Sequence, residues 1–413
     1  MKEISKYLYK FIDQEFLQNN TSKTFWKSRN LNHENMDTFI RHAINDIQNV
    51  KLAWDSHRKN IKETLLPQPQ IPKGNMYSII PKVARECIES RPTYGKQFHF
   101  TIEHQSIELT IVYVFAEDDD RSRVDNGKMN AFFNECLYKI FMWLSYAHKY
   151  KHAECSQTLK IYLYLTDLFK ILPEKNDSVI DVDHANTAFT TSCSPSTEIN
   201  IFREEEWFKV FIHESFHCLG FDFSHLHELC SQSTTRMLEL FNVKSEVNLF
   251  ETWCEMWGEL FNIIIYCVIH ASPGKSTGTI IKKIYSFLKY EQIFSLFQCV
   301  KVLQHQNLNY RDIITKPKHD LYKEKTNVLS YYIIKSILMF HIADFFDFVV
   351  HHNQSSLVFI NSLENIHTYC DLIKKKYNTT DYLFVIENIE KWWNGCRECK
   401  LENITMRMCV LEW

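Results

Sequence analysis

The chain has 413 residues, of which 45% are hydrophobic and 23% are charged, a balance typical of a folded protein with a sizeable core. Its formal net charge of −3 gives no basic surface for nucleic acid, and no apolar stretch is long enough for a membrane span. The first residues lack the apolar run of a signal peptide, and the 13 cysteines follow no disulfide framework. We therefore expect an intracellular, cytoplasmic protein whose thiols stay reduced.

The first 66 residues predict an N-terminal helical segment with two helices, Ile4–Gln18 and Met36–Lys62. Prolines lack the amide hydrogen that regular structure uses, so a cluster of them predicts a linker and a domain boundary. This cluster consists of Pro67, Pro69 and Pro72, followed by Gly74.

Residues 75–205 predict an α+β subdomain. Gln97–Glu103 and Ile107–Phe115 alternate apolar and polar residues on either side of a short polar turn, which is the pattern of a β-hairpin. Three further elements are expected in this subdomain: a helix at Met129–Tyr150 and strands at Leu159–Leu165 and Glu198–Phe202.

Residues 206–413 form the third predicted domain, and they begin with a strong chemical signal, His213-Glu214-Ser215-Phe216-His217. Residues four apart lie on one face of a helix, so both imidazoles can bind one zinc ion, and Glu214 can reach a metal-bound water as a general base. The acidic run Glu204–Glu206 favours a helix N-terminus, and Gly220 favours its end.

A zinc site needs a third ligand, and the sequence offers candidates on a second helix. The extended metzincin motif would have a third His at position 223, but this residue is Phe223, so that class is excluded. Phe250–Asn262 has helical periodicity and places Glu251, Glu255 and Glu259 on one stripe. Such a stripe is often only a solvated acidic face. The bulky tryptophans beside it and the HExxH upstream favour a ligand role for one of these glutamates.

The run Glu251-Thr-Trp-Cys-Glu255-Met-Trp-Gly258, together with the HExxH, resembles the gluzincin metallopeptidases. The resemblance implies one Zn²⁺ per chain, with Glu251 as the third ligand beside His213 and His217. It implies that Glu255 lies behind the ligands and holds one ligating His in a single tautomer. A second register, Glu255-Met-Trp-Gly-Glu259, would make Glu255 the ligand instead.

The same resemblance implies further parts of a peptidase site. An edge strand just before the zinc helix, here Glu198–Phe202, would pair with an extended peptide substrate. A Tyr or His of the C-terminal helical region commonly stabilises the oxyanion, and Tyr331 or Tyr332 is the candidate. No aminopeptidase signature is present, which favours an endopeptidase. Residues 186–193 and 198–203, together with the two motif helices, are also similar to HExxH proteins encoded by large DNA viruses, which implies a virus-encoded protein in the host cytoplasm.

The predicted fold is α+β, with a small mixed sheet packed on the zinc helix and a mostly helical C-terminal region, as in zincins. The predicted function is a zinc-dependent metallopeptidase that acts on protein or peptide substrates, with Glu214 activating the water. The alternative is a non-catalytic zinc-binding or protein-interaction protein that retains a zincin fold. The remaining histidines and cysteines near these segments lack partner ligands in the sequence and are expected to be ordinary residues: His184, His225, His227, and the CxxC pair Cys396 and Cys399.

Overall fold

The structure is a computed structural model, and it describes residues 1–18, 22–29, 31, 33–66, 71–116, 126–175, 178–315, 321–395 and 400–413. Two features of the sequence lie outside these residues. They are the first two prolines of the predicted linker, Pro67 and Pro69, and the CxxC pair Cys396 and Cys399.

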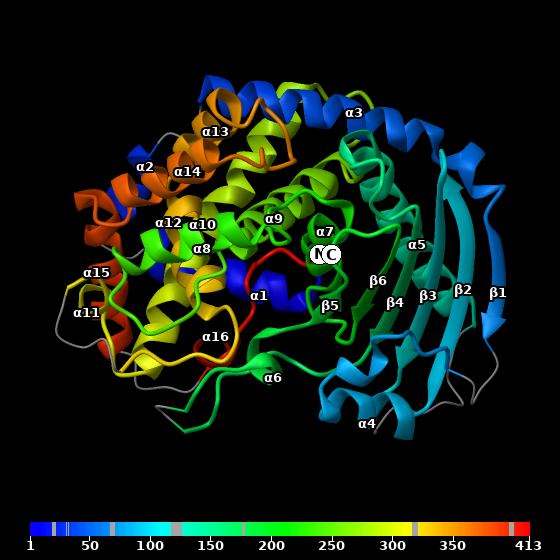
Figure 1. Cartoon of the computed structure of the whole chain (residues 1–413), viewed down its shortest axis with the longest axis horizontal. Helices are drawn as coiled ribbons and strands as arrows, with labels where there is room; N and C mark the ends of the chain where they lie inside the picture. Colours follow the sequence, from blue (N-terminus) through cyan, green and yellow to red (C-terminus); the bar gives the residue numbers. More distant parts are fainter. Residues whose placement is uncertain are drawn as a thin grey trace.

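One mixed six-stranded sheet forms one side of the molecule, and most of the helices form the other (Figure 1). The strand order is β1-β2-β3-β4-β6-β5. β1, β2 and β3 are antiparallel neighbours, β4 and β6 continue the sheet in parallel, and β5 is antiparallel to β6. The α+β fold class and the predicted hairpin are therefore confirmed. The strands are β1 (Lys62–Leu66), β2 (Thr93–Ile102), β3 (Gln105–Val114), β4 (Thr158–Leu165), β5 (Ala188–Thr190) and β6 (Ser196–Ile201).

The predicted edge strand, Glu198–Phe202, is not at the edge. It forms most of β6, which is hydrogen-bonded to β4 on one side and to β5 on the other. The true edge is β5, whose three residues are too few to give a recognisable alternation in the sequence. The side chain of Glu198 is buried. It accepts hydrogen bonds from the backbone amides of Asn75 and Met76, which offset the cost of burying its charge.

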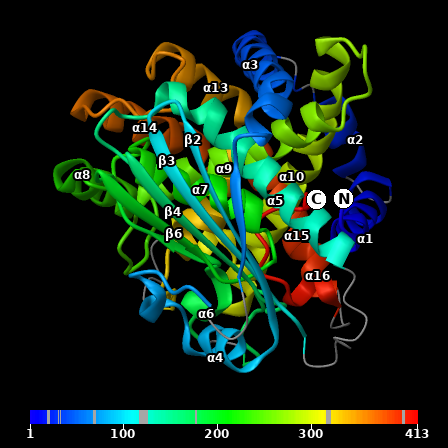
Figure 2. The same cartoon turned by 90° about the vertical axis from the view of Figure 1, so that its right-hand side faces the viewer.

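Helices cover both faces of the sheet, but unequally. In β4, Leu159, Ile161 and Leu163 face the main core, which contains α5 and α7, whereas Tyr162 and Tyr164 face a smaller cluster with α4. Figure 2 shows the strands in front of α7 and α9. The helices are α1 (Glu3–Ile12), α2 (Ser22–Ser28), α3 (Glu34–Arg58), α4 (Lys82–Ser90), α5 (Asn126–Ala147), α6 (Val182–Ala185), α7 (Trp207–Leu219), α8 (His227–Leu238), α9 (Leu249–Ile269), α10 (Thr277–His305), α11 (Tyr310–Ile314), α12 (Lys335–Phe340), α13 (Ile342–His351), α14 (Leu363–Lys376), α15 (Thr380–Gly395) and α16 (Leu401–Ile404), with π-helical turns at Asp13–Gln18 and Leu329–Ile334 and 3-10 turns at Tyr77–Ile79 and His148–Tyr150.

The first predicted helix is confirmed by α1 and the π-helical turn after it, whereas the second is confirmed only in part. α3 ends at Arg58, and Lys62 begins β1 instead of ending the helix. One continuous hydrophobic core contains residues from all three predicted segments, from Leu8 to Trp413. The three-part domain division stays a prediction.

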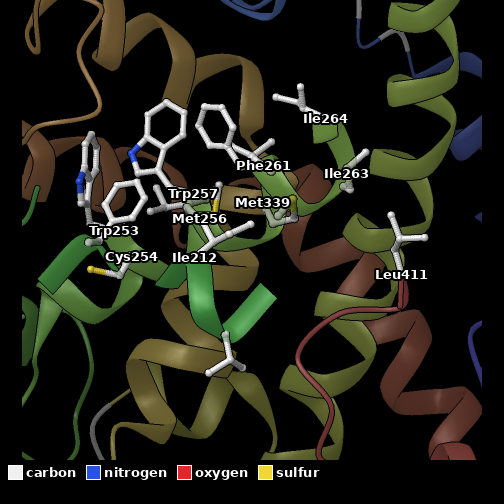
Figure 3. Packing of buried hydrophobic residues seen from close by; sticks show 14 of the residues in the cluster. Ile212, Trp253, Cys254, Met256, Trp257, Phe261, Ile263, Ile264, Met339 and Leu411 are labelled. Atoms are coloured by element: carbon white, nitrogen blue, oxygen red, sulfur yellow. The ribbon is translucent and has the colours of Figure 1, made fainter. Parts of the chain in front are cut away.

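α7 and α9 cross at the centre of this core. Figure 3 shows Ile212 of α7 in one cluster with Trp253, Trp257 and Phe261 of α9. The two helices approach closely at Gly258, where an added Cβ would lie 3.2 Å from the carbonyl oxygen of Lys209. A glycine at this position of α9 therefore lets the two backbones meet.

Residues 405–413 are buried throughout and run between the helices without joining a helix or a strand longer than an isolated bridge. Their backbone groups are bonded by buried side chains. The carboxylate of Glu206 accepts from the amides of Met408 and Cys409, and the carboxylate of Glu291 accepts from those of Val410 and Leu411. Lysine and amide side chains donate to carbonyl groups of this segment: Lys139, Asn262, Gln298, Lys301 and Lys335.

The two chain ends lie side by side, with Lys2 N–H donating to Glu412 O over 2.9 Å (Figure 1).

The expectation of reduced thiols throughout is wrong for one pair, since Cys155 and Cys193 form a disulfide. They lie 38 residues apart, and the sheet brings them together. Because Thr158 of β4 is paired with Ser196 of β6, the residues three positions before each strand are adjacent. The other described cysteines form no disulfide. Within the described ranges, every helix is too short or too polar to span a bilayer.

Candidate metal centre

The HExxH residues lie on α7, which begins directly after Glu206 and ends at Gly220. Gly220 has a left-handed backbone (φ 77°), as expected for a helix end. Glu206, directly before the helix, is a buried anchor, because its carboxylate binds the 405–413 segment and Lys170. The side chains of His213 and His217 lie one turn apart and are buried, and their Nε2 atoms are 3.4 Å apart.

Glu251 of α9 completes a triangle with these two histidines. Its Oε2 atom lies 3.0 Å from Nε2 of His213 and 3.5 Å from Nε2 of His217. Ligands at the corners of a zinc tetrahedron with bonds of 2.0–2.1 Å are about 3.3 Å apart. The three sides of the triangle therefore match the spacing of zinc ligands. These residues are also the donor types that zinc prefers, so the site fits the ion that the sequence predicts.

Glu255, the alternative ligand, lies on the other side of His213. Its Oε2 atom is 3.0 Å from Nδ1 of His213, and its Oε1 atom accepts a hydrogen bond from the buried ammonium group of Lys209. A carboxylate at Nδ1 holds the proton on that nitrogen and leaves Nε2 free for a metal. The geometry therefore matches the position behind the ligands that the gluzincin resemblance implies for Glu255. Its role stays a prediction.

The third glutamate of the stripe, Glu259, is also fully buried and lies 2.5 Å from Nζ of Lys335. The stripe is thus not a solvated acidic face. Glu251 and Glu255 contact opposite sides of the His213 ring, and Glu259 contacts Lys335.

The electrostatics of the metal-free site show strong coupling between the histidines and glutamates. Burial lowers the pKa of His213, but hydrogen bonds with Glu251 and Glu255 outweigh this and raise it to about 9. Burial likewise opposes ionisation of Glu251, yet the neighbouring His217 and His213 hold its pKa well below the usual range. The pKa of Glu214 is raised, chiefly by burial. Without a metal, the site retains protons where a cation would bind.

Two residues that sequence reasoning missed contact the other two ligands. Asp222 Oδ2 lies 2.5 Å from Nδ1 of His217. The side-chain amide of Asn327 donates to Oε1 of Glu251 over 3.0 Å. Asp222 follows the predicted end of α7 and gave a weak signal, whereas Asn327 gave none, since it lies 76 residues from its partner.

The two tyrosine candidates differ. Tyr331 faces the site, with its ring centre 5.9 Å from that of His213 and its hydroxyl 3.5 Å from the amide nitrogen of Asn327. Tyr332 points away, and its hydroxyl donates to the carbonyl oxygen of Met406 over 2.6 Å. Of the two tyrosines, only Tyr331 lines the pocket beside His213 and Glu214, and its role stays a prediction. The histidines expected to be ordinary residues lie elsewhere: His225 and His227 are exposed, and His184 contacts Asp181.

A small cleft, partly open to solvent, adjoins the triangle at His213, and the room inside it is about 20 Å³, enough for a water molecule. Its walls come from α7, from the segment that leads into β5, and from the C-terminal region. The residues that line it include His213, Glu214, Ala188, Tyr331 and Met408. No family model matches the chain, and neither a curated protein nor a solved structure resembles it significantly.

Proposed function

We propose that this protein is a zinc-dependent metallopeptidase. One observation carries the proposal: His213 Nε2, His217 Nε2 and Glu251 Oε2 converge at 3.0–3.5 Å with Glu214 beside them on α7. A purely structural zinc site usually has four protein ligands, whereas three ligands leave a position open for a reactant. A base next to an open site is the arrangement that hydrolysis needs.

The chain order around the site supports a zincin-like fold. The chain passes from the antiparallel edge strand β5 through its neighbour β6 to the motif helix α7. The later helix α9 carries Glu251, the proposed third ligand. In gluzincins an edge strand just before the zinc helix pairs with the substrate backbone. β5 takes that place here, in the role that the sequence assigned to Glu198–Phe202.

The register of β5 shows how an extended peptide would bind. Phe202 N–H donates to Thr187 O and Thr191 N–H donates to Glu198 O, so Ala188 and Thr190 are the non-hydrogen-bonded positions opposite β6. The N–H and C=O groups of these two residues therefore face away from the sheet. An extended substrate chain can add to this edge, and Ala188 lies at the cleft that holds His213 and Glu214.

In the proposed reaction, the zinc ligands, Glu214 and Tyr331 each have a separate role. Zinc bound by His213, His217 and Glu251 would polarise the scissile carbonyl and lower the pKa of a water molecule. Burial raises the pKa of Glu214, which makes its carboxylate a stronger base for the proton of that water and a source of the proton for the leaving amine. Burial also raises the pKa of Tyr331, so its hydroxyl stays protonated and can donate to the developing oxyanion.

The first test combines zinc analysis with peptide cleavage. We expect one zinc per chain in the wild type and in Glu214→Gln, no zinc in Glu251→Ala, and weakened binding in Glu255→Ala. Cleavage of a mixed peptide library, followed by mass spectrometry, should fall about 10²–10⁴-fold in Glu214→Gln. Loss of zinc in Glu255→Ala alone would move the ligand one turn along α9, and a wild type without zinc would refute the proposal. Zinc without any cleavage would favour the non-catalytic alternative.

A further inference from the structure

Asp222 is held beside His217 by the way in which α7 ends. Gly220 adopts the left-handed conformation, and Phe221 N–H then donates to Phe216 O over 2.8 Å, so the chain folds back over the last helical turn. This turn buries the Asp222 side chain to 1% exposure and brings its Oδ2 atom to 2.5 Å from Nδ1 of His217. The contact is therefore built into the helix cap.

Within the described ranges, His217 is the one cationic partner of the Asp222 carboxylate. The other oxygen of this carboxylate accepts a hydrogen bond from the hydroxyl of Ser224. Glu255, which occupies the matching position behind His213, is instead neutralised by Lys209. A buried carboxylate without a cation is costly, and a positive charge at the His217 ring offsets that cost.

We propose that Asp222 is a positioning residue for the metal centre. This inference rests on the proposed zinc site and goes beyond it. Asp222 accepts the Nδ1 proton of His217, fixes the ring orientation, and leaves the Nε2 lone pair directed at Glu251 and His213. Because its charge is not cancelled by a lysine, it makes the imidazole a stronger donor to a dication.

A rival interpretation is a second metal ion held by His217 Nδ1, Asp222 and Cys254, whose ligand atoms also cluster. The Cys254 sulfur lies 3.8 Å from Nδ1 of His217 and 3.7 Å from Oδ2 of Asp222. Two oxygen or nitrogen ligands of one tetrahedral ion are about 3.3 Å apart, however, and the 2.5 Å between Asp222 and His217 is a hydrogen-bond distance. The geometry therefore favours positioning over a second ion.

The test compares the isosteric variant Asp222→Asn with a matched control. Asp181 lies 2.6 Å from Nδ1 of His184 in a partly exposed pair outside the triangle, so Asp181→Asn changes an Asp–His pair that holds no proposed ligand. Zinc affinity is measured by competition with a chromogenic chelator. We expect Asp222→Asn to bind zinc about 10–100-fold more weakly, while Asp181→Asn matches the wild type. Thermal unfolding of each metal-free protein confirms that the variants fold.

Nuclear magnetic resonance gives a second readout that a merely structural residue would not change. In the zinc-loaded wild type, the His217 ring should carry its proton on Nδ1, with the strong downfield shift of a proton shared with a carboxylate. Asp222→Asn should move that resonance upfield.

Several outcomes would overturn the proposal. Equal zinc affinity and an unshifted resonance in Asp222→Asn would leave the proposed peptidase intact and remove the role of Asp222. Two zinc ions per wild-type chain would favour the second-ion interpretation. If Asp222→Asn does not fold, a wild-type His217 proton on Nε2 would refute the proposal by itself. A wild type that binds no zinc would refute both this inference and the proposed function.

Discussion

Glu251 and Glu255 are the same residue type one helical turn apart, yet their carboxylates contact different groups. Glu251 faces the Nε2 side of His213 and His217, whereas Glu255 faces the Nδ1 side of His213 and is bonded to Lys209. The metal-facing side of each ring is thus distinguished from the side that holds the proton. A stripe of glutamates becomes a site only because each carboxylate has its own partner.

Gly258 sets the distance between the two helices of the site, so Gly258→Ala should disturb it. The added methyl would lie 3.2 Å from Lys209 O and 3.4 Å from Cβ of His213. We expect the free energy of unfolding to fall by about 1–2 kcal/mol, because the overpacking exceeds the gain in helix propensity, and zinc affinity to fall as well.

Gly278, near the start of α10, is the matched control, since its added Cβ would meet no atom closer than Ser276 Oγ at 4.0 Å. Gly278→Ala should leave zinc affinity unchanged and be neutral or slightly stabilising. Urea denaturation and chelator competition measure both quantities. Equal behaviour of the two variants would contradict the close approach of α7 and α9.

The pKa of His213 predicts a pH dependence of the metal-free protein. Its folded-state pKa of about 9 exceeds the usual 6.5, so its contribution to stability is complete below pH 6.5 and is lost as the pH rises through 9. We expect the chelator-treated chain to lose up to about 3 kcal/mol over this window. His213→Gln should show a smaller loss, as measured by urea denaturation at pH 6 to 9.5. A wild-type stability that rises over the same range would contradict the coupling of His213 with its glutamates.

The sequence predicts the site residues that belong to a recognisable motif and misses Asp222 and Asn327, which belong to none. His213, Glu214 and His217 follow from one motif. Helical spacing offers Glu251, Glu255 and Glu259 on one stripe, and the gluzincin resemblance selects Glu251, with Glu255 as the alternative. Asn327 could not be found, because only folding brings it to a carboxylate 76 residues away.

At the scale of elements, long amphipathic helices and the hairpin are predictable, whereas short strands are not. β5 has three residues, and its importance comes from its place at the sheet edge beside α7. Lys62–Leu66 is mostly exposed and lacks the alternating apolar residues that would mark a strand. The predicted helix before it therefore extends as far as Lys62. Pairing with β2 makes it a strand.

The disulfide fastens the turn between β5 and β6, so its loss should loosen the substrate-side hairpin. Cys193 lies between the two strands, and Cys155 lies in the loop before β4, where Ser156 Oγ also bonds Cys218 O of α7. A loop of 38 residues predicts that Cys155→Ser/Cys193→Ser lowers the free energy of unfolding by about 2–4 kcal/mol.

Peptide mapping without reduction should recover the fragment that links Cys155 to Cys193, and hydrogen exchange should rise first in residues 186–196 of the double variant. The free Cys230, which is half-buried, provides the control. Cys230→Ser should leave both readouts unchanged. Recovery of both cysteines as free thiols from protein purified without reductant would refute the disulfide.

Across the whole molecule, residues 405–413 hold together parts that lie far apart in the chain. Glu206 before α7, Glu291 of α10 and Lys335 of α12 each bond the backbone of this segment. Met408 also lines the cleft, and its sulfur lies 3.6 Å from Nζ of Lys209. Residues 405–413, which form no helix or extended strand, thus contact both the start of α7 and the cleft.

A chain that ends after Thr405 should therefore lose both its compact fold and its zinc. Removal of the segment takes away the hydrogen bonds that buried Glu206, Glu291 and Lys335 make with it, and buried charges that lose partners are strongly destabilising. Near-ultraviolet circular dichroism and zinc analysis should both show the loss, while Glu3→Gln, an exposed change in α1, should not. A truncated chain that still binds one zinc would refute the supporting role of the segment.

This dependence also sets the order of events during synthesis. The helix with the zinc motif leaves the ribosome long before the residues that fix its start, since Met408 follows Glu206 by 202 residues. At 5–20 residues per second, that interval lasts about 10–40 s. Throughout it, the growing chain carries the motif but lacks the contacts that shape the cleft. We therefore expect the proposed peptidase activity to appear only after residues 405–413 have folded into place.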